Sequence, residues 1–453
     1  MNYTLKTSLG NITGLEQEYC YKFLGVPFAA ASRFEYAEPI TEYGDLDCTK
    51  PGKSCTQKRP KYQNLTHPTR RFYYKEFREG INFEYGEDCL NMNIFMPKDD
   101  EVHPILVYVF GGGFDSGSID EGAFDGSAFA KLGITVFFVT YRVGVFGFFC
   151  HKEIQSEYGR DGNFGLDDIK VALEFIKKHA SDFKGDPDNI TLMGQSNGAM
   201  SIQYLCCNEK HKGLFNKAIM LSGGGKLPDI ALPKPHEKVQ EYWKRYMDIL
   251  KCNTLDELKG KTAEELIDAS EVLKRQRKDN RSNTMPVIDG YLIDKPIKAA
   301  IKNPLDIPYI VGYTNCDLYG IVMAGMAHKY AEYTNTYLCY FDIDAPGDHN
   351  KAFHASELRY IFNTLASSWR PYDEVDKQRA DDLINYLVNF IKTGDPNDAD
   401  RPIWEKGSKR ALRITRDRIY MSKPDKLQLT YRTITKPYPK DEREYVNKGI
   451  IQP

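Results

Sequence analysis

Short apolar runs recur along the chain, each bounded by turn residues, and segments with helical spacing separate them. The clearest runs cover residues 105–110, 134–141, 190–193, 218–221 and 307–311. Unbroken apolar runs of this length are typical of strands buried on both faces of a parallel sheet. Strands that alternate with helices predict an α/β fold with a doubly wound, mostly parallel sheet, whose ligand site lies at the carboxyl ends of the strands.

Two helices stand out between and after these runs. An apolar stripe at helical spacing lies between the second and third run and consists of Leu166, Ile169, Leu173 and Ile176. A second helix is predicted near the end of the chain, where Leu383, Tyr386, Leu387, Phe390 and Ile391 share one helical face. We expect it to end at Gly394, because glycine is the usual residue at a helix C-cap.

Residues 226–302 have a different pattern, with charged helices and few strand signals. Thr262 and Glu265 form a capping box ahead of an apolar helix face. We interpret this segment as a helical cap inserted into a single domain of residues 1–453, since neither a linker nor an internal repeat interrupts the chain.

Composition and charge narrow the classes of function. The 453 residues include 61 basic and 63 acidic residues, which gives a net charge of −2. This balance lacks the basic surplus of proteins that bind nucleic acids or anionic membranes. No apolar stretch approaches the ~18 residues of a membrane span, and the start shows no export signal. We expect a soluble, cytoplasmic protein without nucleic-acid or membrane partners, and the oligomeric state stays open.

A candidate nucleophile follows the third apolar run. The residues Gly194-Gln195-Ser196-Asn197-Gly198 match G-x-S-x-G, with a strand before the motif and a helical pattern after it. In this context the motif forms a tight turn that raises the serine oxygen clear of the backbone, and the glycines avoid clashes on either side. Ser196 is therefore the candidate nucleophile.

A serine hydroxyl needs a base that a third group orients, and on this type of sheet the chain order is serine, acid, histidine. Only His328, His349 and His354 follow both Ser196 and a suitable acid. Asp317 is the best acid by position, because it lies on the loop after the run 307–311. Spacing alone leaves three other acids open: Asp342, Asp344 and Asp348.

Consecutive glycines follow the first apolar run, at Gly111-Gly112-Gly113-Phe114. Glycines let backbone N–H groups turn toward a ligand, as an oxyanion hole requires. A dinucleotide-binding fingerprint is excluded because its last glycine position holds Ser116.

These features together resemble the type-B carboxylesterase family of α/β hydrolases, which includes the cholinesterases, and most of all its bacterial carboxylesterases. The resemblance runs nearly end to end. It includes Phe23-Leu24-Gly25-Val26-Pro27-Phe28, Glu87-Asp88-Cys89-Leu90-Asn91, the glycine run, Gly162-Asn163-Phe164-Gly165, the serine motif and Phe353-His354-Ala355-Ser356-Glu357-Leu358.

The resemblance implies an α/β-hydrolase fold and a serine carboxylesterase. It assigns the nucleophile to Ser196, the base to His354 and the acid to Asp317, with an oxyanion hole formed by the N–H groups of Gly112, Gly113 and Asn197. Such an enzyme hydrolyses small-molecule esters through an acyl-enzyme and needs no cofactor or metal. Since neutral imidazole is the base, kcat/KM is expected to fall as pH drops through ~6.5.

The sequence departs from the family at three positions beside the site. Gln195 stands where the family usually has glutamate, Asn197 where it has alanine, and Phe110 where it has histidine or tyrosine. We expect the triad to survive, since an amide still forms hydrogen bonds. Two rival interpretations are an inactive binding protein on the same fold and a hydrolase of thioesters, amides or lipid esters.

Two further expectations come from the resemblance. His354 follows Asp317 by only 37 positions, fewer than in most relatives, where this interval forms one wall of the substrate gorge. We therefore expect an open mouth lined by Phe114, Leu318, Tyr319 and Met323. Cys55 and Cys89 match a pair that is disulfide-bonded in secreted relatives, and in a cytoplasmic protein we expect both to be reduced.

Overall fold

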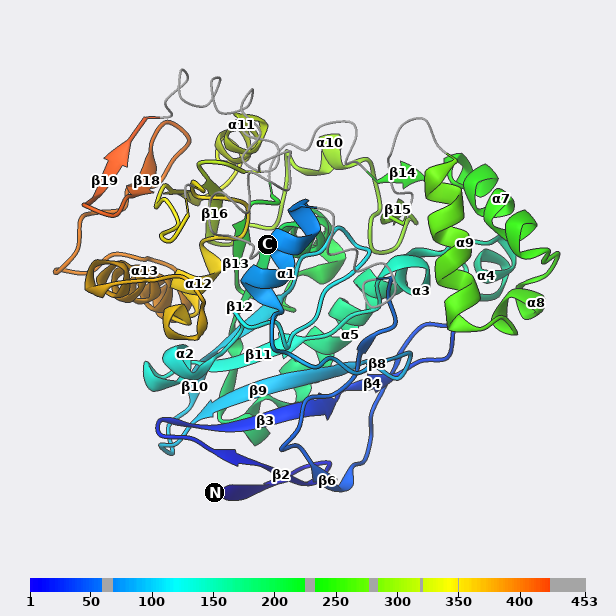
Figure 1. Cartoon of the computed structure of the whole chain (residues 1–453), viewed down its shortest axis with the longest axis horizontal. Helices are drawn as coiled ribbons and strands as arrows, with labels where there is room; N and C mark the ends of the chain where they lie inside the picture. The colour runs from blue at the N-terminus through cyan, green and yellow to red at the C-terminus, as the bar shows by residue number, and fades with distance from the viewer. Residues whose placement is uncertain (59–67, 225–232, 277–283, 318–320, 349, 424–453) are drawn as a thin grey trace.

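The computed structural model describes residues 1–58, 68–224, 233–276, 284–317, 321–348 and 350–423 (Figure 1). The strands are β1 Asn2–Thr7, β2 Gly10–Glu16, β3 Cys20–Pro27, β4 Ala29–Ala30, β5 Glu38–Pro39, β6 Gly44–Asp47, β7 Ser54–Cys55, β8 Tyr85–Gly86, β9 Asn91–Pro97, β10 His103–Val109, β11 Thr135–Val139, β12 Gly185–Gln195, β13 Lys217–Leu221, β14 Lys234–Pro235, β15 Val287–Ile288, β16 Tyr309–Thr314, β17 Thr336–Phe341, β18 Ala411–Ile414 and β19 Ile419–Ser422.

The helices alternate with these strands over the middle of the chain. They are α1 Pro68–Phe77, α2 Ser127–Lys131, α3 Gly144–Phe148, α4 Lys152–Tyr158, α5 Phe164–His179, α6 Asn197–Cys206, α7 Gln240–Leu250, α8 Leu255–Lys259, α9 Ala263–Arg275, α10 Ile297–Ala300, α11 Ile321–Tyr330, α12 Leu358–Ile361 and α13 Glu374–Thr393.

The main sheet has 13 strands among the described residues, in the order β1-β2-β3-β9-β11-β10-β12-β13-β16-β17-β18-β19, with β6 paired to β2. The neighbours from β11 through β18 pair in parallel, whereas β1, β2, β3 and β9 at one end and β19 at the other pair antiparallel. The predicted doubly wound, mostly parallel sheet is therefore confirmed.

The five predicted strands all form and lie in the centre of this sheet, as β11, β10, β12, β13 and β16. Their side chains are buried almost throughout, which explains why their sequences are continuously apolar. Strand β12 is longer than the predicted run 190–193, since it begins at Gly185, six residues after α5 ends at His179.

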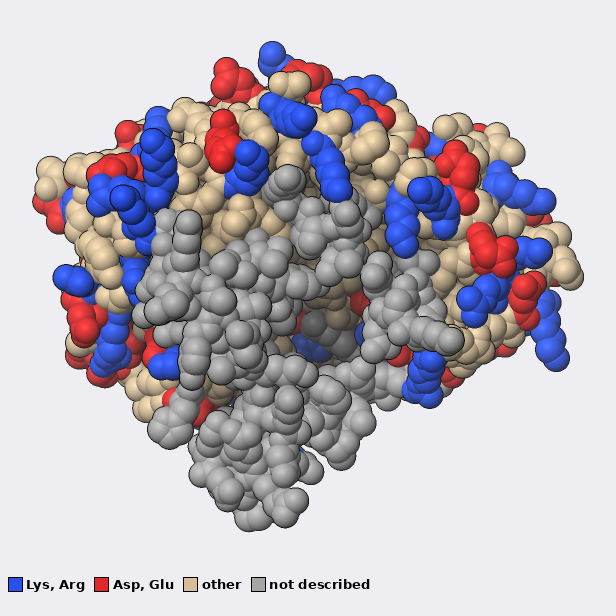
Figure 2. All heavy atoms as spheres, turned by 90° about the horizontal axis from the view of Figure 1, so that it is seen from above, with Lys and Arg blue, Asp and Glu red and all other residues tan. Residues whose placement is uncertain are grey.

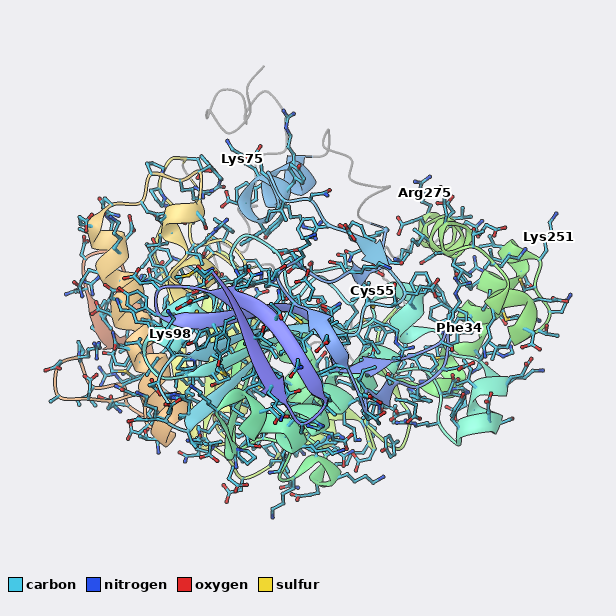
Figure 3. The ribbon with its side chains drawn as sticks, turned by 90° about the horizontal axis from the view of Figure 1, so that it is seen from below. Phe34, Cys55, Lys75, Lys98, Lys251 and Arg275 are labelled. Carbon is cyan, nitrogen blue, oxygen red and sulfur yellow. The ribbon has the colours of Figure 1, made fainter. Side chains whose placement is uncertain are left out.

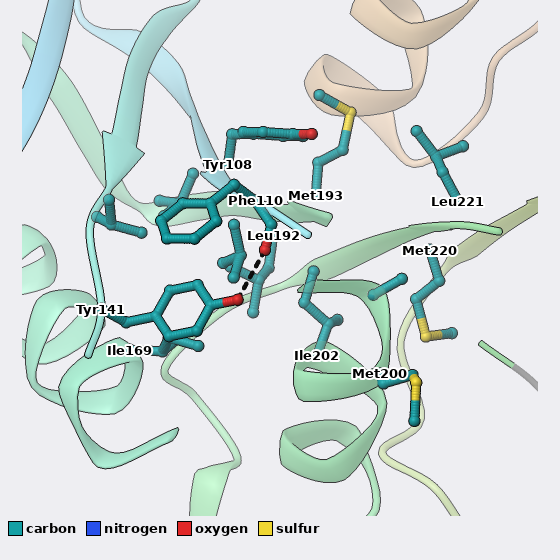
Figure 4. Packing of buried hydrophobic residues seen from close by; sticks show 14 of the residues in the cluster. Tyr108, Phe110, Tyr141, Ile169, Leu192, Met193, Met200, Ile202, Met220 and Leu221 are labelled. Carbon is teal, nitrogen blue, oxygen red and sulfur yellow. Dashed lines mark hydrogen bonds between the residues drawn. The ribbon is translucent and has the colours of Figure 1, made fainter. Parts of the chain in front are cut away.

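Hydrophobic packing between the sheet and its helices surrounds the start of the glycine run. Figure 4 shows Phe110, at the end of β10, lying against Tyr141, with ring centroids 4.4 Å apart. The Tyr141 hydroxyl donates to the Phe110 carbonyl at 2.9 Å. Ile202 of α6 lies fully buried beneath the same strands. The glycine run that follows Phe110 thus begins from a rigid point.

Helices α7, α8 and α9 lie together at one end of the molecule, next to α3 and α4 (Figure 1). Thr262 and Glu265 form the expected capping box of α9. The interpretation of residues 226–302 as one cap inserted in a single domain stays a prediction, and parts of that segment lie outside the described residues.

The two predicted helices are confirmed as α5 and α13, and Gly394 ends α13 in the left-handed conformation with φ 81°. Within the described part of the chain, no helix combines the length and apolar character needed to cross a membrane.

Candidate active site

Ser196 lies in a strained turn between β12 and α6. Its backbone angles are φ 56° and ψ −124°, a conformation that L-residues rarely adopt. The two flanking glycines are required by space, because a Cβ on Gly194 would lie 2.7 Å from the Gly198 carbonyl carbon and one on Gly198 only 2.1 Å from the Val109 oxygen. Ser196 is partly exposed whereas its neighbours in β12 are buried, so the turn brings this residue to the surface.

His354 and Asp317 come together on adjacent loops. His354 Nδ1 lies 2.6 Å from Asp317 Oδ1, and both side chains are buried. A parallel bridge between Cys316 and Phe353 joins the two loops directly, with the Cys316 N–H donating to the Ala352 carbonyl at 2.8 Å. The chain neighbours of Asp317 and His354 are therefore hydrogen-bonded to each other.

The environment of Asp317 favours its carboxylate form. Burial by itself would raise the pKa of Asp317, but the charge and hydrogen bond of His354 outweigh burial and the pKa is lowered. Ser222, just after β13, and the backbone N–H of Thr314 also lower this pKa. The Thr314 N–H donates to Asp317 Oδ2 at 3.2 Å.

The other predicted alternatives lie elsewhere or have other partners. His328 contacts the Tyr313 hydroxyl and the Ser408 carbonyl, away from Ser196. His349 lies outside the described residues. The remaining acids each bind a cation: Asp342 binds Arg413, Asp344 binds Lys351 and Asp348 binds Arg370.

The glycine run lies against the serine turn. A Cβ on Gly111 would come within 2.8 Å of the Ser196 Cβ, and the atom nearest to a Cβ on Gly113 is Asn197 Oδ1 at 4.0 Å. Gly112 and Gly113 both have positive φ, at 129° and 73°. Gly113 is exposed, and Asn197 is the first residue of α6. The structure thus brings together the three residues that the sequence predicts for an oxyanion hole.

Gln195 contacts the histidine directly. Its side-chain Nε2 lies 3.2 Å from His354 Nε2, the ring nitrogen opposite the one that binds Asp317. Among the described residues this amide, and not the serine hydroxyl, is the hydrogen-bond partner of that nitrogen. The glutamine that replaces the family's usual glutamate therefore contacts the predicted base.

Glu357 is a functional candidate that the sequence did not single out. It is buried three residues after His354, and neither carboxyl oxygen accepts a hydrogen bond from another described residue. Burial, followed by the nearby charge of Asp317, raises the pKa of Glu357 to about 8. Its place in the motif Phe353 to Leu358 was visible in the sequence, but its burial beside Asp317 was not.

The residues expected at the mouth of the site are only partly described. Phe114 is fully buried, with its ring 5.1 Å from that of Phe148. Met323 is buried on α11, while Leu318 and Tyr319 lie outside the described residues. The open mouth therefore stays a prediction.

The described side chains offer no cluster suited to metal binding. Within the described ranges, no three or more His, Cys, Asp or Glu side chains are grouped so as to hold a metal ion. Cys55 and Cys89 are buried thiols in contact, and the hydrogen bond from Cys55 and then burial raise the pKa of Cys89 well above its ordinary value.

Comparison with known proteins identifies the family. The model of the carboxylesterase family matches residues 2–329 and 318–430. The chain is 28% identical to para-nitrobenzyl esterase of Bacillus subtilis, over 86% of this chain and 90% of that protein. It is 27% identical to carboxylesterase 5A of Canis lupus familiaris, over 84% of this chain and 79% of that protein.

Solved structures agree on the fold. A structure of a PNB esterase superposes with a TM-score of 0.81 at 24% identity, over 96% of this chain and all of that one. A thermophilic PNB esterase gives the same TM-score at 23% identity. The fold is that of an α/β hydrolase. The chain belongs to the carboxylesterase family, and it is a carboxylic-ester hydrolase.

Proposed function

We propose that the chain hydrolyses carboxylic esters through an acyl-enzyme on Ser196, with His354 as the base and Asp317 as the acid that orients it. The observation that carries this proposal is the 2.6 Å contact between His354 Nδ1 and Asp317 Oδ1. A carboxylate at Nδ1 holds the proton there and leaves the lone pair on Nε2, the nitrogen that must accept the serine proton.

The reaction has two parts. In the first, Ser196 Oγ attacks the ester carbonyl while His354 Nε2 takes its proton, and the alcohol then leaves with that proton. In the second, water attacks the acyl-enzyme with the same base, and the carboxylic acid is released. Rotation of the Gln195 amide away from His354 Nε2 frees that nitrogen for Ser196, since substrate-free sites often lack the final hydrogen bond.

The oxyanion hole consists of the backbone N–H groups of Gly112, Gly113 and Asn197. The closeness of Gly111 to Ser196 and of Gly113 to Asn197 supports this assignment. Each donor of this kind is worth on the order of 10²–10³ in rate. The start of α6 adds a partial positive charge on the same side.

The substrates we propose are small-molecule esters that enter through a mouth lined by Phe114, Leu318, Tyr319 and Met323. Figure 2 shows Lys, Arg, Asp and Glu side chains interspersed over the described part of one face, which favours no strongly charged partner. We also propose a cytoplasmic location, in which the buried cysteines Cys55 and Cys89 stay reduced.

Steady-state kinetics on a p-nitrophenyl ester test the proposal. Ser196→Ala and His354→Gln are each expected to lower kcat by about 10⁴-fold or more. His328→Gln is the matched control, because this histidine binds Tyr313 and Ser408 instead of the triad, and it should retain activity. Undiminished hydrolysis by folded Ser196→Ala would refute the proposed nucleophile.

A further inference from the structure

A cluster of charged side chains joins helix α9 to the loop of the proposed oxyanion hole. Asp115, two residues after Gly113, accepts hydrogen bonds from Lys274 Nζ at 2.9 Å and 2.8 Å, one to each carboxyl oxygen. Thr284 Oγ1 donates to the same carboxylate at 2.6 Å, and Lys58 Nζ donates at 3.2 Å. Lys274 lies in the last turn of α9, so this contact connects two segments 159 residues apart.

The cluster is nearly balanced in charge and mostly buried. Glu271, one turn before Lys274 on α9, contacts Lys274 at 3.4 Å and Lys58 at 3.6 Å. The side chains of Asp115 and Lys274 are only 12% and 17% exposed. In Figure 3, Arg275 marks the end of α9, and Cys55 lies on the same side of the molecule. The chain continues from Cys55 to Lys58, which contacts Asp115.

The surroundings of Asp115 favour its carboxylate form. Burial by itself would raise the pKa of Asp115, but the ammonium groups of Lys274 and Lys58 outweigh burial and lower that pKa to about 2. Loss of Lys274 would therefore leave a mostly buried carboxylate with one cation in place of two, and such a group moves toward solvent or toward another partner.

Hydrogen bonds join Asp115 and Ser116 to the glycine run. The Asp115 N–H donates to the Gly112 carbonyl at 3.3 Å, and Ser116 Oγ donates to the same carbonyl at 3.2 Å. A Cβ on Gly112 would lie 1.8 Å from the Ser116 carbonyl oxygen, so the loop is folded back tightly on itself. Asp115 and the backbone of Gly112 and Gly113 therefore belong to one compact, hydrogen-bonded loop.

We propose that Lys274 is a positioning residue, which holds Asp115 so that helix α9 sets the aim of the Gly112 and Gly113 N–H groups. Lys274 need not touch substrate for this role. The proposal rests on the proposed function, because it assumes that these N–H groups stabilise an oxyanion.

The test compares an ester with the thionoester of the same acid and alcohol. Sulfur is a weaker hydrogen-bond acceptor than oxygen, so thionoester hydrolysis depends less on the oxyanion donors. In Lys274→Met we expect kcat for the ester to fall about tenfold, with KM changed less than about twofold. This loss is smaller than the loss caused by removing one oxyanion donor, because the donors are only misdirected. The ratio of ester to thionoester kcat/KM should fall by a similar factor, and Lys274→Arg should restore it.

The matched control is Lys259→Met. Lys259 on α8 also joins this group of helices to the rest of the chain, through an ion pair with Glu35 at 2.7 Å. Glu35 is far in sequence from the glycine loop, so this ion pair does not involve that loop. This variant should leave kcat and the ester to thionoester ratio unchanged, even where its melting temperature falls. Thr284→Val removes one hydrogen bond and no charge, and it should lower the ratio in the same direction by a smaller factor.

Three results would overturn the proposal. One is an unchanged kcat in folded Lys274→Met, whether or not its melting temperature falls. Another is an equal loss for ester and thionoester, and the third is the same loss in Lys259→Met. If Lys274→Met does not fold, Thr284→Val decides by the same ratio. Failure of the proposed function is distinguishable, because then the wild-type chain itself would show no hydrolysis that depends on Ser196.

Discussion

The side-chain amide of Gln195 lies 3.2 Å from Nε2 of His354, on the side of the ring opposite Asp317. An amide can donate to neutral imidazole and, after rotation, accept from imidazolium. A glutamate at this position, as relatives of this family usually have, adds a full negative charge beside the proposed base. With glutamine at this position, no negative charge from residue 195 lies beside His354.

The first prediction concerns Gln195→Glu. A carboxylate about 3 Å from the ring stabilises the protonated imidazolium, so the acid limb of the kcat/KM profile should move upward by about 1 pH unit or more. The measurement is kcat/KM against pH for the wild-type chain and the variant. Gln195→Met, which removes the amide without adding charge, should not move the limb upward. Coinciding acid limbs for the wild type and Gln195→Glu would contradict this interpretation of the contact.

The second prediction concerns the buried carboxyl of Glu357, which lies close enough to Tyr108, Cys339 and Asp317 to affect them electrostatically. Its pKa is about 8 in the folded chain against 4.5 for the ordinary group, because burial and then Asp317 disfavour the charge. The folded state thus keeps a proton that the unfolded state loses above about pH 4.5. The free energy of unfolding therefore falls as pH rises from about 4.5 to 8, and this loss is complete above the folded pKa.

Glu357→Gln removes this dependence, because glutamine does not titrate. The free energy of unfolding of the variant, measured relative to that of the wild type, should rise from pH 5 to pH 9 by at most about 5 kcal/mol. Chemical denaturation at the two pH values measures the gain. Exposed Glu101→Gln is the control and should show no such difference. If the free energies of unfolding of the wild type and Glu357→Gln differ by the same amount at both pH values, the account of Glu357 is contradicted.

The third prediction concerns the thiols. We expect all ten cysteines to be reduced, including the adjacent pair Cys55 and Cys89. Because all ten side chains are buried, the native chain should react slowly with a thiol reagent and the denatured chain fully. Thiol titration of protein from its native source, denatured without reductant, checks this. Fewer than ten reactive thiols would mean that a disulfide forms.

The centre of the sheet could be predicted from the sequence because its strands are buried on both faces. Strands such as β10 and β11 are continuously apolar, and that signal is independent of their neighbours. The edge strands could not be predicted in this way. In β1 the burial alternates and polar side chains occupy four of the six positions. The interior strand β17 was not predicted either, although it is buried throughout between β16 and β18; its sequence begins with a threonine and includes two tyrosines.

The candidate site likewise has residues that local sequence pattern predicts and contacts that only the fold reveals. Ser196 and the glycine run lie directly after apolar strands, so local pattern was enough to find them. The partners of His354 required the fold, since Gln195 lies 159 positions away, and spacing alone had left four acids open. The contact between Lys274 and Asp115 was also invisible, because ordinary charged residues give no sign of a long-range partner.

The most direct test of the central claim is covalent labelling of Ser196. A fluorophosphonate reacts with a serine that a base activates and an oxyanion hole supports, and it leaves a stable adduct. Intact-mass measurement, followed by peptide mapping, should find one adduct per chain on the peptide that carries Ser196, and none in folded Ser196→Ala. A folded wild-type chain that takes up no label, or an adduct that persists in Ser196→Ala, would contradict the account.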